Sequence, residues 1–291
     1  MVLYHIFERC DDVFVVLRII TSEKSIVKRR KQKKAIAKSA AKSYSTDKGL
    51  PFFVLDVLNE KHGVDWDRVA EKCGRYASRI IAPRDFPLPD HTKLRRFIPL
   101  SMNSLLIFNT ALETIRNAGL PPEGISITLT DRNAVHCDRI GLLLPFAACI
   151  RIITSQPERY AAACEKAYED CGASLIIRSY YEPSVKPDIV ICADGAISSS
   201  MKDAAIFTSR RKTGGKLRIC GSGTLVAEHH KELVAQGIDS VDFCGAITEL
   251  CGSPEYRNSV FEKLDISCNS CTDSSPQKCL ECFCSGSLPI N

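Results

Sequence analysis

The sequence lacks the features of several protein classes. No hydrophobic run approaches the roughly 18 residues that a membrane-spanning helix needs, and the N-terminus has no basic, apolar and small-residue pattern of a secretory signal. Aromatic residues make up only 7% of the chain, with one Trp, and no repeat of fixed period is present. The 291 residues, 45% of them hydrophobic and 25% charged, have a globular composition. We expect a cytoplasmic protein without a transmembrane segment, large enough to bury a core.

Positive charge is concentrated in one segment. Residues 24–48 hold ten Lys or Arg and one Asp, a local charge of +9, whereas the whole chain carries +5. The rest of the chain therefore carries −4. The stretch 23–44 has no Pro or Gly and is rich in Lys and Ala, so it should be helical. This basic arm suits an acidic partner or nucleic acid, although a solvated helix would look the same. Tyr44 is its one aromatic residue, so base stacking is not expected.

Fifteen cysteines are many for this length, and their number is odd. Without a secretory signal they are expected to be reduced thiols, and most lie in apolar or helical contexts.

The cysteine-rich tail has a regular spacing. Two C-x-x-C pairs are separated by seven polar, turn-forming residues, and Cys284 follows; the pairs are Cys268, Cys271, Cys279 and Cys282. Four thiolates complete a tetrahedral zinc site and also suit an iron–sulfur cluster. We therefore predict a metal site here, with a disordered reduced tail as the alternative.

The N-terminal half shows a hairpin and helices. Val2–Arg9 and Val13–Ile20 are expected to form the hairpin. Apolar residues at helical spacing predict a helix over 65–80. A second helix over 103–118 should end at Gly119, with Pro121 beyond.

The pattern changes after residue 121, where short apolar segments alternate with amphipathic ones. This alternation is typical of βαβ units and a parallel sheet. Strands are expected over 125–130, 149–153, 173–177, 188–192 and 216–220, and helices over 133–147 and 155–172. Further helices are expected over 227–235, 241–250 and 254–264.

The block 103–223 resembles the NAD(P)-binding Rossmann domain of the shikimate dehydrogenase and glutamyl-tRNA reductase type. The helix 103–118 would lead into the first strand of that domain. The segment Ile153–Tyr160 corresponds to the family's Asn-Arg-Thr-x-x-Arg motif, and Asp188–Gly195 to its fourth strand and turn. The resemblance covers about 40% of the chain and implies an NAD(P) site.

The residues depart from that family where a dinucleotide would bind. The first β-to-α turn, 130–134, contains no Gly, and the carboxylate of Asp131 would repel a phosphate. Thr154 and Ser155 replace the acidic residue that binds ribose, and Arg159 is the one Arg nearby. These departures argue against ordinary dinucleotide binding and indicate a degenerate domain.

Two Gly-containing segments follow expected strands, where open α/β sheets bind ligands. Asp194 and Gly195 form one; Gly221 and Gly223 form the other and could make an anion-binding nest. Plain tight turns are the alternative. An NAD(P) site would use the residues Asp131, Thr154, Ser155, Arg159, Asp194, Gly195, Gly221 and Gly223.

The expected fold class is α/β, a Rossmann-like parallel sheet with an N-terminal mainly helical region and C-terminal helices. The expected segments are a hairpin plus basic helix (1–48), a mainly helical region (49–120), the degenerate Rossmann-like domain (121–225), C-terminal helices (226–267) and the cysteine-rich tail (268–291).

The leading functional hypothesis is a non-catalytic protein with a metal-binding tail and a basic arm for an acidic partner. The alternatives are an NAD(P)-dependent oxidoreductase with an atypical phosphate turn and a nucleic-acid-binding protein that uses residues 24–48. The sequence alone does not decide whether the protein is an enzyme.

Overall fold

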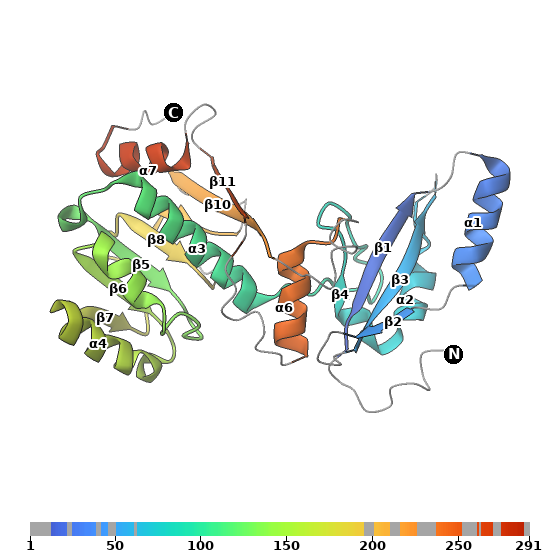
Figure 1. Ribbon diagram of the computed structural model, residues 1–291, viewed down its shortest axis with the longest axis horizontal. Coiled ribbons are helices and arrows are strands. Elements are labelled where there is room, and N and C mark those ends of the chain that lie inside the picture. Colours follow the sequence, from blue (N-terminus) through green and yellow to red (C-terminus); the bar gives the residue numbers. More distant parts are fainter. Residues whose placement is uncertain are drawn as a thin grey trace. The chain divides into compact units, whose positions relative to one another are not determined.

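The computed structural model describes residues 13–21, 25–38, 42–45, 51–60, 63–194, 201–209, 216–225, 237–251, 261, 263–269 and 275–287. The chain forms two compact units (Figure 1). The first unit contains residues 1–102 and 224–262, and the second contains 103–223 and 263–291. The expected strand Val2–Arg9, the helix 227–235 and most of the helix 254–264 lie outside the described residues.

The first unit contains a four-stranded sheet in the order β2-β3-β1-β4. Its strands are β1 (Val15–Thr21), β2 (Lys42–Ser45), β3 (Pro51–Asn59) and β4 (Ile80–Ile81). β1 pairs in parallel with both β3 and β4, while β2 is antiparallel to β3. The region 49–120 is therefore mixed rather than mainly helical. The missed strand β3 is buried over much of its length, so it reads as a nearly continuous apolar run without alternation.

The helices of the first unit are α1 (Ile26–Lys38), α2 (Trp66–Cys73), the 3-10 helix η1 (Gly74–Ser78) and α6 (Ser240–Leu250). The predicted helices 65–80 and 241–250 are confirmed, although the first changes to 3-10 geometry after Cys73. Asp65 caps α2, because its side chain accepts a hydrogen bond from the Arg68 amide. On one face of the sheet, Val69 and Cys73 of α2 pack against β1 and β3.

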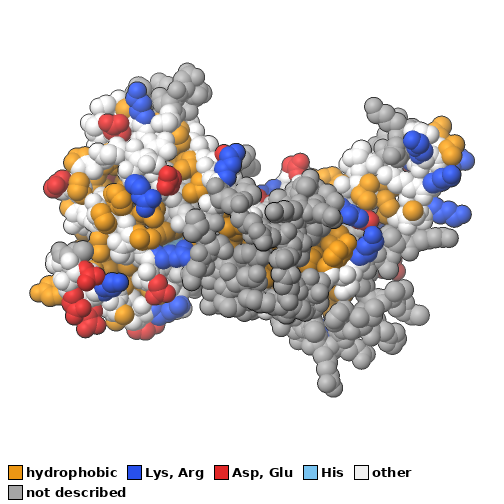
Figure 2. Space-filling view, in the orientation of Figure 1, with side chains coloured by type: hydrophobic (Ala, Val, Ile, Leu, Met, Phe, Trp, Pro, Cys, Tyr) orange, Lys and Arg blue, Asp and Glu red, His pale blue; other side chains and the backbone are white. Residues whose placement is uncertain are grey.

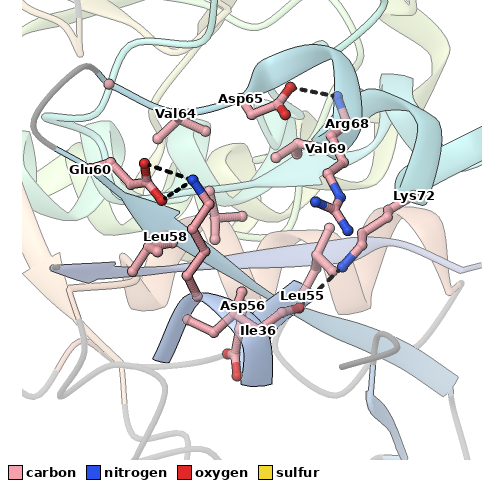
Figure 3. A pocket seen from close by; sticks show the side chains of 13 residues that line it. Ile36, Leu55, Asp56, Leu58, Glu60, Val64, Asp65, Arg68, Val69 and Lys72 are labelled. Carbon is pink, nitrogen blue, oxygen red and sulfur yellow. Dashed lines mark hydrogen bonds and ion pairs between the residues drawn. The ribbon is translucent and has the colours of Figure 1, made fainter. Parts of the chain in front are cut away.

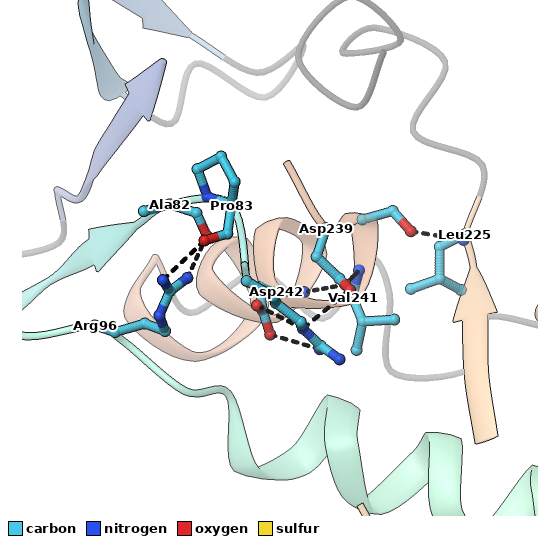
Figure 4. A network of polar contacts seen from close by, with 9 residues as sticks. Ala82, Pro83, Arg96, Leu225, Asp239, Val241 and Asp242 are labelled. Carbon is cyan, nitrogen blue, oxygen red and sulfur yellow. Dashed lines mark hydrogen bonds and ion pairs between the residues drawn. The ribbon is translucent and has the colours of Figure 1, made fainter. Parts of the chain in front are cut away.

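Ion pairs fix the start of α6, where Asp239 and Asp242 lie (Figure 4). Arg84 Nη2 lies 2.9 Å from Asp242 Oδ1, and its Nε lies 3.0 Å from Asp239 Oδ2. Asp239 is the N-cap of α6 and accepts hydrogen bonds from the amides of Val241 and Asp242. Phe243 of α6 packs edge-on against Phe52 of β3. The ion pairs and the aromatic contact together hold α6 within the first unit.

The second unit has a Rossmann-like α/β fold. Its strands are β5 (Ser126–Thr130), β6 (Cys149–Ile153), β7 (Leu175–Arg178), β8 (Ile189–Cys192), β9 (Ala205–Phe207), β10 (Leu217–Thr224) and β11 (Lys263–Cys268). The order is β11-β10-β9-β8-β5-β6-β7. The first six strands therefore run 3-2-1-4-5-6, the doubly wound order of dinucleotide-binding domains, and all pairs from β7 to β10 are parallel. The predicted parallel sheet is confirmed, and β9 and β11 are added to it.

Helix α3 (Leu100–Ala118) covers one face of this sheet (Figure 1). It ends before Gly119, which has a φ of +61°, as the sequence predicted. Side chains of α3, including Phe108 and Ile115, pack with Ile189 and Ile191 of β8. The alternate β8 residues Val190 and Cys192 belong to a second cluster. The other helical segments are η2 (Pro122–Gly124), η3 (Ile140–Phe146), η4 (Pro157–Tyr160), α4 (Ala161–Cys171) and α7 (Pro276–Cys284).

The cysteine-rich tail contributes to the second unit. It forms α7, whose Ser275 N-cap accepts a hydrogen bond from the Lys278 amide. Cys279 and Leu280 are buried in the same cluster as α3. The alternative of a disordered tail is therefore wrong for residues 275–287, because this stretch has an apolar face that the core buries. None of the helices that the structure describes is long and apolar enough to cross a membrane.

Candidate functional site: the crevice at the carboxyl ends of the strands

The ligand crevice of a doubly wound sheet lies beyond the carboxyl ends of its strands, where the strand order reverses. In this chain the reversal falls at β5, between β6 and β8. The residues that end these strands are Thr130, Ile153 and Cys192, and the segments after them contain most of the predicted site residues.

The segment after β5 does not form the helix that the sequence predicted over 133–147. Turns follow Thr130, and the first helical geometry is the 3-10 helix η3, which contains Pro145. Proline lacks the N–H that an α-helix interior needs. The strand is therefore not followed directly by a helix N-terminus, which is the element that binds pyrophosphate in dinucleotide-binding domains.

The carboxylate of Asp131 satisfies the amides of this segment instead. Its Oδ1 accepts a hydrogen bond from the Val135 amide over 2.9 Å, and its Oδ2 accepts one from the His136 amide over 2.8 Å. The Tyr160 hydroxyl donates a third hydrogen bond to Oδ2 over 2.6 Å. Asp131 is 2% exposed and Tyr160 is fully buried. An internal carboxylate therefore takes the hydrogen bonds that loop amides give to a bound anion in other proteins of this fold.

Burial, with the nearby charge of Asp131, raises the pKa of the Tyr160 hydroxyl far above its ordinary value. Tyr160 therefore remains a neutral donor at any physiological pH. A neutral hydroxyl can hold the carboxylate in place, but it supplies no charge that would attract a phosphate.

His136 completes the buried polar cluster. Its Nε2 lies 2.7 Å from Ser104 Oγ of α3, and its ring stacks on Phe108. Within the described residues, its Nδ1 has no hydrogen-bond partner. Burial lowers the pKa of His136 to about 4, so the ring is neutral near pH 7. Asp131, whose charge opposes this shift, accepts a hydrogen bond from the His136 backbone amide. Because the imidazole is fully buried, it has no route to a substrate.

Backbone carbonyls of the loop after β5 accept hydrogen bonds from the residues after β6 that were predicted to line a dinucleotide site. The hydroxyls of Thr154 and Ser155 both donate to Arg132 O, as does the Ser155 amide. Arg159 Nη1 donates to Asn133 O over 2.9 Å. The structure thus brings Asp131, Thr154, Ser155 and Arg159 together, but their contacts join two loops.

A hydrogen bond also connects the ends of β5 and β8, on the other side of the point where the strand order reverses. Thr130 Oγ1 donates to Asp194 Oδ1 over 2.8 Å, which links the ends of β5 and β8. Asp194 is exposed at this position, and Gly195 lies outside the described residues.

Gly221 and Gly223 lie inside strand β10 rather than in a turn after it. The anion-binding nest expected at these residues is therefore wrong, since a nest requires a turn conformation. A Cβ at Gly221 would collide with the side chain of Thr110 on α3. Gly221 thus allows β10 and α3 to approach closely.

These contacts do not fit a dinucleotide bound in the ordinary way. The loop amides of Val135 and His136 already donate to Asp131, the glycine-rich turn is absent, and the ribose-binding acid is replaced by two hydroxyls that bond Arg132 O. A phosphate would meet a buried carboxylate at this position.

The predicted metal site is not supported by the described residues. Cys268 Sγ lies 3.4 Å from Cys279 Sγ, but Cys279 is disulfide-bonded and Cys271 lies outside the described residues. Cys282 is a free thiol. Among the side chains that the structure places, no three His, Cys, Asp or Glu form a group that could hold a metal ion. A zinc or iron–sulfur site stays a prediction from the cysteine spacing.

The basic arm forms α1, as predicted. No acidic residue occurs within Ile26–Lys38, and blue side chains gather over this helix in Figure 2. Lys33 Nζ pairs with Glu60 Oε1 over 2.8 Å. In the described part of the chain, the exposed cations Lys28, Arg30, Lys31 and Lys34 have no ion-pair partner.

Comparisons with known proteins leave the chain without a family. No protein-family model and no curated protein matches it. Among solved structures, L-tryptophan dehydrogenase from Nostoc punctiforme is similar over 84% of this chain and 77% of that chain, with 16% identity and a TM-score of 0.27. So remote a likeness carries no argument, and the fold assignment rests on the strand order.

Sequence reasoning missed Tyr160 and His136. Tyr160 lies 29 residues after Asp131 and His136 lies five residues after it, and both fall within segments that were predicted to be helical. The absence of Gly after β5 was the one signal that this turn is unusual; it did not show which side chains complete the cluster.

Proposed function

We propose that this protein is a nucleic-acid-binding protein that contacts phosphates through α1, and that its Rossmann-like unit is a scaffold without redox activity. The observation that carries the proposal is the exposed, acid-free helix α1. A phosphate polymer presents a negative charge at every residue, so it can engage several cations of one helix at once. The three hydrogen bonds that Asp131 accepts from Val135, His136 and Tyr160 in the second unit support the scaffold role.

The mode of binding follows from the residue types on α1. Lys and Arg contact phosphates and position a protein on a duplex, and they read sequence only where they also reach base edges in a groove. Tyr44, the aromatic residue of the basic segment, stacks on Phe52 with ring centroids 5.6 Å apart. Tyr44 is thus engaged within the first unit. Binding should therefore depend strongly on salt and little on sequence.

Fluorescence anisotropy with a labelled DNA duplex of about 20 base pairs tests the proposal, because each phosphate contact adds about −0.9 to the slope of log K against log salt. With four cations engaged, the expected slope is about −4. Replacing Lys28, Arg30, Lys31 and Lys34 by Gln should abolish most of this dependence.

The matched control removes the same charge elsewhere. Lys166, Lys202, Lys263 and Lys278 are exposed and lie in the second unit, so their replacement by Gln should preserve binding. Equal loss in both variants would show that only net charge matters and would contradict a site on α1. Binding of labelled poly-glutamate of equal charge, with no binding of the duplex, would instead identify an acidic protein as the partner.

A cytoplasmic location belongs to the same proposal. Among the described side chains, eleven cysteines are free thiols and Cys279 is disulfide-bonded. Free thiols of this number favour a reducing compartment.

An NAD(P)-dependent oxidoreductase is the second candidate, and the 3-2-1-4-5-6 strand order favours it. It requires the cofactor to displace the hydrogen bonds of Asp131 or to bind outside them. Saturable dinucleotide binding distinguishes the two candidates, since only the oxidoreductase predicts it.

A further inference from the structure

A cavity of about 320 Å³ lies in the first unit between α1, β3 and α2 (Figure 3). Its volume falls at the lower end of the roughly 300–1,000 Å³ typical of small-molecule sites. The apolar side chains that line it are Ile36, Leu55, Val57, Leu58, Val64 and Val69. Such a lining suits the hydrocarbon part of a ligand.

The carboxylates around this cavity all have partners. Asp56 accepts from Arg18 Nη2 over 2.7 Å, on β1. Glu60 pairs with Lys33, and the Asp65 side chain accepts from the Arg68 amide at the start of α2. Each of these acids is thus engaged by a hydrogen bond or an ion pair, and Asp56 also attracts Lys72.

Two cations of α2 border the same cavity. Arg68 and Lys72 lie one turn apart, and in Figure 3 their side chains extend side by side from α2. Lys72 Nζ donates to Ile36 O over 3.3 Å, on α1. Burial, followed by the charge of Arg68, lowers the pKa of Lys72. The positive charges of Arg68 and Lys72 therefore repel each other beside the apolar lining of the cavity.

We propose that the cavity binds a small amphipathic carboxylate, with its apolar body against Leu55, Leu58 and Val69 and its anionic group between Arg68 and Lys72. The anion would relieve the repulsion between the two cations, and the apolar body would displace water from the lining. This site is independent of nucleic-acid binding by the exposed face of α1.

Isothermal titration of the full chain with octanoate tests the proposal, with octan-1-ol and octylammonium as neutral and cationic matches of the same chain length. Octanoate should bind saturably at one site and raise the melting temperature, because a ligand of the folded state stabilises it. Absence of octanoate binding, or equal binding of either match, would overturn the proposal.

Two variants test separately the contribution of the two cations and that of the open cavity volume. Arg68→Gln/Lys72→Gln should weaken octanoate binding at least about tenfold, the factor that one lost charge-assisted contact corresponds to. Val64→Trp keeps both cations but fills the cavity, and it should abolish binding. Lys166→Gln/Lys202→Gln in the second unit is the control with equal charge and should bind normally. Unchanged octanoate affinity in either test variant, once circular dichroism shows it is folded, would refute the site.

Discussion

The Tyr160 hydroxyl donates a hydrogen bond of 2.6 Å to Asp131 Oδ2, although the two residues come from segments that follow different strands. This contact joins the segment after β5 to η4, which follows β6. It fixes the carboxylate at the position where a Rossmann-type domain presents its anion-binding turn. The protein thus holds its own anion at the first turn of the sheet.

Removing that anion should destabilise the protein. In Asp131→Ala, the amides of Val135 and His136 and the Tyr160 hydroxyl lose their acceptor. Buried unsatisfied donors cost about 1–3 kcal/mol each, so with partial relaxation we expect a loss of about 2–4 kcal/mol in the free energy of unfolding. Urea denaturation measures this loss.

Tyr160→Phe is a milder substitution whose loss of stability can be compared with that of Asp131→Ala. It removes one donor and leaves the two amide contacts, so it should cost about 1–2 kcal/mol. If Asp131→Ala is no more destabilising than Tyr160→Phe, the carboxylate does not organise the loop.

His136 should make stability depend on pH. Its pKa is about 4 in the folded state, and a histidine in the unfolded chain has a pKa of about 6.5. Protonation therefore favours unfolding, and the contribution is complete above pH 6.5 and lost as the pH falls towards 4. The loss over this window is about 3 kcal/mol at most.

Urea denaturation from pH 7 to pH 4 measures the slope, which His136→Leu should reduce. His91 is exposed, so His91→Asn should keep the wild-type slope. Identical slopes for wild type and His136→Leu would show that other groups cause the acid sensitivity.

Arg84 should stabilise the first unit through α6. Arg84→Met leaves the carboxylates of Asp239 and Asp242 without their cation, and the Asp242 side chain is only 7% exposed. Because Arg84 itself is 45% exposed, we expect a cost of about 2 kcal/mol, below the 3–5 kcal/mol of a fully buried pair. Thermal unfolding of wild type and Arg84→Met measures this loss of stability.

The exposed pair Arg116–Glu113 provides the control, since its shortest contact is 3.7 Å and both side chains are largely solvated. Arg116→Met should change stability by less than about 0.5 kcal/mol. Equal effects of the two substitutions would mean that the Arg84 contacts are as weak as surface ion pairs.

Leu280 tests whether the cysteine-rich tail is part of the fold. It is fully buried in the core of the second unit. Leu280→Ala should lower the free energy of unfolding by about 2–4 kcal/mol, as cavity-forming substitutions do. Glu281→Ala, at the adjacent exposed position, should have little effect. A neutral Leu280→Ala would mean that α7 does not dock on the core.

Local signals explain which elements could be predicted. Strands β5, β6 and β8 are short apolar runs between turn residues, and α3 ends at Gly119 ahead of Pro121, so sequence patterns located them well. β9 has only three residues and was missed. The helix predicted over 155–172 begins at Ser155, yet the Ser155 hydroxyl donates to Arg132 O, which the parallel pairing of β5 and β6 brings near.

The candidate site was predictable only in part. The residues at the carboxyl ends of β5 and β6 could be chosen because parallel strands end at one edge. Their roles depend on contacts between segments more than 20 residues apart, such as Thr154 with Arg132. The requirement for glycine at position 221 was likewise not predictable from local sequence, because it arises from contact with Thr110 on helix α3.

Isothermal titration with NAD⁺, NADP⁺, NADH and NADPH tests the central claim most directly, namely that the chain's own residues fill the dinucleotide crevice. We predict no saturable binding of any of the four at ligand concentrations up to about 1 mM. Saturable binding of one of them with a Kd below about 1 mM, abolished by Gly195→Trp or Arg159→Glu, would contradict the claim and restore the oxidoreductase.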